Sequence, residues 1–267
     1  MTVLHAVSAD GTVVRAADDG RGPVVLVVHG GGESVASWDG VTEALAAEFR
    51  VVRIERRIYA PGATAGPRHS TAVEAADILA VAAAVGRPAL LLGHSSGAVA
   101  ALEAAVLRPD SFGGLFLYEP PVGSRTPVGG PAADLAQAAI AAGRPLEAVR
   151  IHLRDIVGLP ADAVERLVRD PGLRATAADR APVWAADIRA VDALGVGLDR
   201  YASLGLPVTL LEGELSPAHL RERLADLAAV LPDARVVTLP NCGHTAHRSR
   251  PRTVARAVRH AARPPVG

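Results

Sequence analysis

The sequence contains no lysine, because all 28 of its basic residues are arginine. A phosphate-binding loop of the P-loop type needs a lysine. So does an enzyme that forms a Schiff base with a carbonyl substrate or with pyridoxal phosphate. The composition therefore excludes both classes of site.

Cysteine is almost as scarce, since Cys242 is the only one among 267 residues. An intrachain disulfide and a cysteine-rich metal site are both excluded. No apolar run approaches the ~20 residues that span a bilayer, and the N-terminus does not resemble a signal peptide. The net charge is zero, which gives no field toward nucleic acid or membrane. We expect a cytoplasmic protein that binds neither.

Short apolar runs are present, and eight of them read as strands. Three are apolar throughout, as expected for strands that are buried on both faces of a parallel sheet. The first two flank SADG, a hairpin signal that places them at a sheet edge. The runs lie at 2–7, 12–17, 23–29, 50–55, 89–93, 114–119, 208–213 and 235–240.

Helical patterns fall between most of these runs, and Ser216 is a plausible N-cap of one of them. Alternating strands and helices predict an α/β fold with a mostly parallel sheet. The stretch 121–206 breaks the alternation with a Pro/Gly-rich linker and helical patterns only, and it reads as an inserted cap. The predicted core helices lie at 34–48, 71–85, 96–107, 217–230 and 251–262.

GHSSG (93–97) follows one apolar run and precedes a helical pattern. This is the context of a nucleophile elbow, a tight turn that exposes the central serine, here Ser95, at a helix N-terminus. The alternative is a glycine-rich turn without catalytic function. Without lysine it cannot be a P-loop, and it lacks the G-x-G-x-x-G spacing of a dinucleotide site.

HGGG (29–32) follows the third predicted strand. Rigid backbone N–H groups stabilise the oxyanion that develops in acyl transfer. The N–H groups of Gly31 and Ser96 are the natural pair of donors, although a plain turn with flexible glycines would have the same sequence.

CGHTAH (242–247) follows the last predicted strand. A histidine on this loop can reach the elbow and act as general base. We favour His244 for this role over His247. A metal site of Cys242, His244 and His247 is the alternative, but no fourth ligand has a suitable spacing. We expect no cofactor and no metal.

Taken in order, these stretches resemble the α/β-hydrolase superfamily over nearly the whole chain. The resemblance implies an α/β-hydrolase fold: a mostly parallel eight-stranded sheet, helices on both faces, and a helical cap inserted after strand 6. The core would comprise 1–120 and 207–267, and the cap 121–206. The serine, acid and histidine of a catalytic triad would follow in that order.

The position of the acid of the triad differs from that in many relatives, which carry an aspartate three residues after the glycine that ends the seventh strand. That position holds Ser216. Glu214 is close in sequence, but Glu119 ends the sixth strand, where some relatives carry their acid, and two prolines fix its backbone. We favour Glu119 and leave Glu214 open.

The loop at 53–66 departs as well, with Tyr59 near a position where relatives often have glycine. Tyr59 could donate a hydrogen bond to substrate or pack under the cap. Trp184, in the insertion, could line the pocket.

The resulting hypothesis is a serine hydrolase that cleaves an ester or lactone of a small molecule. Ser95 would form an acyl-enzyme, His244 would act as base and Glu119 would orient it. Two alternatives stay open: a lyase, cyclase or perhydrolase of small-molecule biosynthesis, or a ligand-binding protein without catalysis. Substrate identity and oligomeric state, including a homodimer, are not determined by the sequence.

Overall fold

A computed structural model of the chain describes residues 2–63, 69–86 and 89–262. It contains an eight-stranded sheet in the order β1-β2-β4-β3-β5-β6-β7-β8. All pairs from β4 to β8 are parallel, and β2 is antiparallel to both of its neighbours. The strands are β1 (Thr2–Val7), β2 (Val13–Gly20), β3 (Val24–Val28), β4 (Arg50–Ile54), β5 (Ala89–His94), β6 (Phe112–Tyr118), β7 (Val208–Gly213) and β8 (Ala234–Leu239).

The middle of the sheet is buried on both faces. Every residue of β3 is buried: Leu26 packs into one core and Val27, which points to the other face, packs into the second. At the edge, β1 leaves Val3 and Val7 exposed. Continuous apolar runs therefore became central strands, and the predicted hairpin became the edge. The predicted fold class, a mostly parallel α/β sheet, is confirmed.

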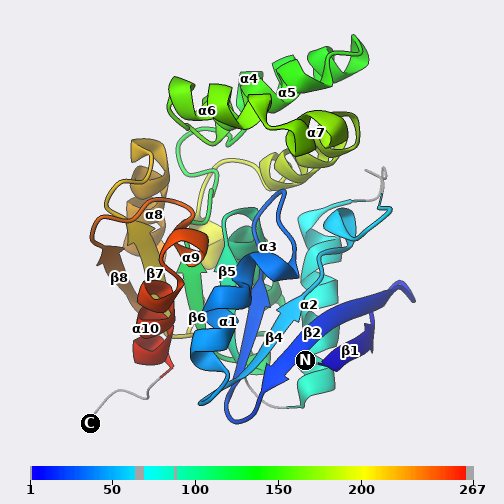
Figure 1. Cartoon of the computed structure of the whole chain (residues 1–267). Coiled ribbons are helices and arrows are strands. Elements are labelled where there is room, and N and C mark those ends of the chain that lie inside the picture. Colours follow the sequence, from blue (N-terminus) through cyan, green and yellow to red (C-terminus); the bar gives the residue numbers. More distant parts are fainter. Residues whose placement is uncertain (1, 64–68, 87–88, 263–267) are drawn as a thin grey trace.

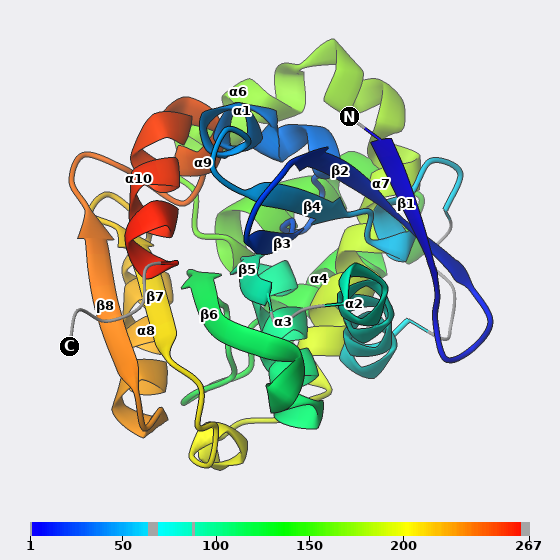
Figure 2. The same ribbon diagram turned by 90° about the horizontal axis from the view of Figure 1, so that it is seen from below.

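Helices cover both faces of the sheet, as Figure 2 shows from below. On one face, α2 (Thr71–Val85), α3 (Ser96–Leu107) and α8 (Ala218–Val230) pack against the sheet. On the other face lie α1 (Asp39–Leu45), α9 (Ala246–Ser249) and α10 (Pro251–Ala261), with the fully buried Trp38 beneath them.

Four α-helices, the π-helix His152–Ile156 and the 3-10 turn Asp199–Tyr201 lie between β6 and β7 in sequence, and we call the four α-helices the cap helices. They sit above the carboxyl ends of the parallel strands (Figure 1). Trp184 and several alanines of these helices form a hydrophobic cluster of their own. The cap helices are α4 (Gly130–Ala141), α5 (Pro145–Ile151), α6 (Ala161–Arg169) and α7 (Pro171–Asp192).

Three local predictions differ from the structure. The helix predicted at 34–48 is a 3-10 turn, Val35–Trp38, followed by α1, because the same apolar spacing fits both. Ser216 is not an N-cap: α8 begins at Ala218, its N-cap is Pro217, and Ser216 is buried one residue earlier. The helix α9 was not predicted because a single turn has no periodic pattern.

Residues 64–66 of the altered loop lie outside the described residues. Within the described ranges, no helix combines the length and the apolar character that crossing a membrane requires.

Candidate active site

Ser95 lies at a tight turn between β5 and α3, with φ 52° and ψ −131°. This backbone conformation is costly for a residue with a side chain. Close packing explains both flanking glycines: a Cβ on Gly93 would lie 2.4 Å from the Cα of Ala98. A Cβ on Gly97 would lie 2.2 Å from the carbonyl oxygen of His29. The turn therefore has the geometry of a nucleophile elbow.

Backbone strain marks three loops at this edge of the sheet. Among the described residues, those with positive φ that are not glycine are Ser95 (52°), Glu119 (45°) and Asn241 (54°). They follow β5, β6 and β8, and Asn241 begins the loop that carries His244. Strained residues persist where the surrounding structure holds them, which is common at active sites.

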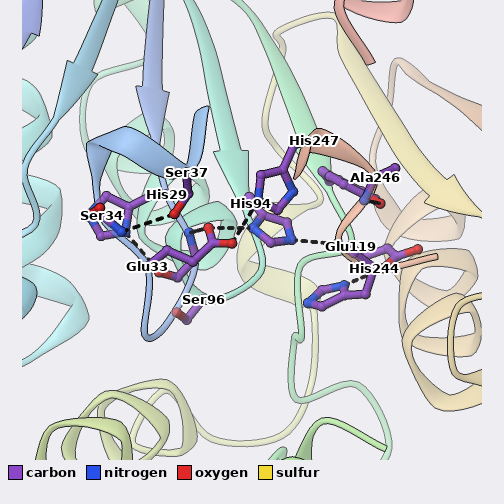
Figure 3. Close-up of polar contacts among 12 residues, drawn as sticks. His29, Glu33, Ser34, Ser37, His94, Ser96, Glu119, His244, Ala246 and His247 are labelled. Carbon is purple, nitrogen blue, oxygen red and sulfur yellow. Dashed lines mark hydrogen bonds and ion pairs between the residues drawn. The ribbon is translucent and has the colours of Figure 1, made fainter. Parts of the chain in front are cut away.

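The structure brings Glu119 and His244 together (Figure 3). Glu119 is fully buried, and one of its carboxylate oxygens accepts a hydrogen bond from Nδ1 of His244. The other oxygen accepts the N–H of Gly213 at 2.7 Å. Glu214 is exposed and instead accepts the N–H of Asn241 at 2.8 Å. Of the two candidate acids, Glu119 is the one that contacts the histidine.

The pKa values of this pair follow from burial and from the bond between them. Burial is the largest single influence and raises the pKa of Glu119, but the hydrogen bond and charge of His244 together with the N–H of Gly213 hold the pKa below its usual value. Burial lowers the pKa of His244, against the opposing effect of Glu119. An ionised Glu119 accepts a hydrogen bond from the N–H at Nδ1 of His244. This bond keeps the proton of the neutral imidazole on Nδ1 and leaves Nε2 free to act as a base.

Ser95 and His244 line one cavity of about 610 Å³ between the core and the cap helices. Gly31 and Ser96 line it as well. Because Ser96 is the first residue of α3, its N–H has no acceptor within the helix. An oxyanion that forms beside Ser95 could therefore be bound by this N–H.

The cap contributes apolar side chains to the wall of the cavity. Trp184 is one of them, and it was named from the sequence as a residue that could line the pocket. Figure 1 shows the cap helices above this edge of the sheet. A larger hollow, about 1190 Å³, lies at the opposite edge and contains none of the predicted catalytic residues. The cap residues lining the cavity with Ser95 include Val128, His152, Ile156, Leu173, Trp184 and Ile188.

Glu33 is a partly buried residue of the site that the sequence did not reveal, and its side chain is 10% exposed. Its carboxylate binds Nε2 of His247 at 2.7 Å, Nδ1 of His94 at 3.2 Å and the N–H of Gly30 at 3.0 Å (Figure 3). Burial would raise the pKa of Glu33, but His94 and His247 hold it well below its usual value. The only signal was its place directly after HGGG, in a loop that is expected near the nucleophile.

His247, the lesser candidate for the base, is used elsewhere. It stacks on Trp38 with ring centroids 4.7 Å apart and is 1% exposed. His94 extends the contact to the base, since its Nε2 lies 2.9 Å from the carbonyl oxygen of His244. Glu33, His94 and His247 therefore support the loop that carries His244.

Cys242, His244 and His247, the residues of the alternative metal site, do not point their ligand atoms at one common position. Cys242 is buried as a free thiol, His244 binds Glu119 and His247 binds Glu33. Two other groups of the described residues bring three potential ligands within 4.8 Å of one another. In the first, Glu33 already bonds both histidines. In the second, which consists of His69, Glu74 and Asp187, a guanidinium already bridges the two carboxylates.

Comparisons with known proteins identify hydrolases that are similar to this chain. The sequence profile of the alpha/beta hydrolase family matches residues 24–257. The chain is 25% identical over 251 residues to the 2-(acetamidomethylene)succinate hydrolase of Mesorhizobium japonicum, covering 90% of this chain and 88% of that protein. It is 39% identical over 98 residues to the pimeloyl-[acyl-carrier protein] methyl ester esterase of Methylococcus capsulatus. That match spans 37% of each protein.

Among solved structures, an alpha/beta hydrolase from Sphaerobacter thermophilus superposes with a TM-score of 0.78 at 29% identity. The superposition covers 97% of this chain and 99% of that one.

Proposed function

The chain belongs to the alpha/beta hydrolase family, and from this premise we propose that it is a serine hydrolase acting on an ester or lactone of a small molecule. The observation that carries the proposal is the buried hydrogen bond between Glu119 and His244, in a cavity that also contains the strained Ser95. The similarity to a methyl ester esterase supports an ester as the bond that is cleaved. We place the reaction in the cytoplasm, with a small molecule as the partner.

In the proposed mechanism, the Oγ of Ser95 attacks the carbonyl carbon of the substrate while Nε2 of His244 takes its proton. Glu119 keeps the other ring proton on Nδ1 and stabilises the imidazolium. The N–H groups of Gly31 and Ser96 bind the oxyanion. The imidazolium then protonates the leaving alkoxide, and the acyl group remains on Ser95.

Water completes the cycle. His244 removes a proton from a water molecule, whose oxygen attacks the acyl carbon. The imidazolium returns this proton to Oγ of Ser95 as the bond between Oγ and the acyl carbon breaks, which restores the free enzyme. The products are the free acid and the alcohol. For a lactone both groups stay on one molecule, a hydroxy acid.

The test is the hydrolysis of p-nitrophenyl acetate, p-nitrophenyl butyrate and γ-butyrolactone by the wild type and by Ser95→Ala. We expect wild-type turnover, and a loss on the order of 10³-fold or more in Ser95→Ala. The matched control is Ser203→Ala, at an exposed serine before β7, which should keep wild-type rates. Turnover that survives in Ser95→Ala would contradict the proposal. A folded wild type that binds these compounds without cleaving them would favour a ligand-binding protein.

A further inference from the structure

A buried polar cluster connects the cap to the nucleophile elbow. Asp187, on the cap helix α7, is 3% exposed. One of its oxygens accepts hydrogen bonds from the hydroxyl groups of Ser96 at 2.7 Å and Tyr59 at 2.6 Å. Its other oxygen binds Nη2 of Arg56 at 2.7 Å. The hydroxyl of Tyr59 therefore donates its hydrogen bond to a residue of the cap.

Arg56 is the centre of the cluster on the core side. It forms a two-bond ion pair with Glu74 of α2, at 2.8 and 2.6 Å. Its Nη1 also donates to the hydroxyl of Ser96 at 2.9 Å and to the carbonyl of His29 at 3.3 Å. The hydroxyl of Ser96 therefore accepts from Arg56 and donates to Asp187, which fixes it from both sides.

The cluster touches both proposed oxyanion donors. Ser96 belongs to it directly. Gly31 borders it so closely that a Cβ there would lie 3.1 Å from Oδ2 of Asp187 and 3.3 Å from Oγ of Ser96. Ser96, which carries one of these N–H groups, is thus hydrogen-bonded to a side chain of the cap, and Gly31, which carries the other, lies beside that side chain.

The charges in the cluster fit a positioning role. Burial would raise the pKa of Asp187, but Arg56, the nearby His69 at 3.6 Å and the hydrogen bonds of Tyr59 and Ser96 hold it well below its usual value. A bare carboxylate beside an oxyanion would oppose catalysis. Arg56, which also pairs with Glu74, lies against this carboxylate and offsets part of its negative charge, so the cap holds Ser96 with a carboxylate that is not bare.

We propose that Asp187 is a positioning residue through which the docked cap sets the geometry of the oxyanion hole. This inference rests on the proposed serine-hydrolase function. Its consequence is that the cap does more than bound the cavity: without the contact of Asp187 with Ser96, substrate still binds but acylation slows. A purely structural role for Asp187 would change stability and leave the turnover of the folded enzyme unchanged.

The experiment compares Asp187→Asn with Asp192→Asn, a matched substitution on the same helix. Asp192 accepts the N–H groups of Val128 at 2.6 Å and Gly130 at 2.9 Å, so its loss weakens the cap away from the elbow. The readouts are kcat and KM for p-nitrophenyl butyrate, the rate of Ser95 labelling by a fluorophosphonate, and the melting temperature.

For Asp187→Asn we expect kcat and the labelling rate to fall about 10- to 100-fold, with KM within about 3-fold, because misplaced catalytic groups slow the reaction more than they weaken binding. Asp192→Asn should lower the melting temperature but keep kcat within about 3-fold. Equal kcat in folded Asp187→Asn and wild type would overturn the inference.

Ser96→Ala is the second variant, in case Asp187→Asn does not fold. It removes the hydroxyl that bridges Arg56 and Asp187, but keeps the backbone N–H and the ion pair that holds the cap. We expect kcat to fall about 10-fold, and an unchanged kcat would again overturn the inference. If the wild type neither turns over esters nor reacts with the probe, the proposed function itself fails. If it does both and the variants match it, only the role of Asp187 fails.

Discussion

Glu119 shows at the scale of a single residue what the sequence could predict. It ends an apolar run and precedes two prolines, and these local features placed it at a strand end, while its role as the acid followed from the resemblance to relatives that carry their acid there. The structure puts the side chain against His244. Glu33 had only its place after HGGG as a signal, and nothing in the sequence pointed to its partners His94 and His247, which lie 61 and 214 residues away. A contact of that kind depends on the completed fold.

Substitution of Glu119 tests its role directly. In Glu119→Gln, kcat should fall on the order of 10³- to 10⁴-fold, because the amide no longer holds His244 in the reactive tautomer. The hydrogen bond with Glu119 raises the pKa of His244, so the acid limb of kcat/KM should move to lower pH in the variant. The measurement is a pH–rate profile with p-nitrophenyl butyrate.

Glu214→Gln is the matched control, since this exposed carboxylate bonds only the N–H of Asn241 among the described residues. It should retain the wild-type profile. If Glu214→Gln lost activity while Glu119→Gln kept it, the assignment of the acid would be reversed.

At the scale of elements, strands were predicted closely because continuous apolar runs between glycines and prolines have few alternatives. The run at 208–213, for example, became β7 with the same bounds. The contacts of the cap helices with the core were not predictable. Asp187 lies in a helical stretch of the insertion with no motif that singles it out, and its contact with Arg56, which is 131 residues away, depends on how the cap packs on the core.

The packing of helix α3 against the end of strand β3 can be tested at Gly97, where the two elements are in close contact. In Gly97→Ala the new methyl group would lie 2.2 Å from the carbonyl oxygen of His29, so helix and strand would have to move apart. We expect the free energy of unfolding to fall by about 3 kcal/mol. Urea denaturation measures this change.

Gly205→Ala is the control for this effect, since a Cβ there meets no atom within 4 Å and its φ is not positive. The same methyl group should then change the unfolding free energy by less than about 1 kcal/mol. A similar loss in both variants would mean that close packing at the elbow is not the cause.

At the scale of the whole molecule, the parallel sheet explains why distant segments meet. Strands β5, β6 and β8 end at one edge, so the loops that carry Ser95, Glu119 and His244 converge there although they span 150 residues. The cap helices lie over the same edge (Figure 1). The order of the elements in the sequence predicted this convergence. The shape of the cavity depends on how cap and core pack, so the sequence could not predict the substrate.

The central claim is that Ser95 is an activated nucleophile. The most direct test is labelling with a fluorophosphonate probe, read by intact mass, on the folded wild type and on Ser95→Ala. Our account predicts a single adduct on the wild type and no adduct on the variant. An adduct that persists in Ser95→Ala, or a folded wild type that does not react, would contradict it.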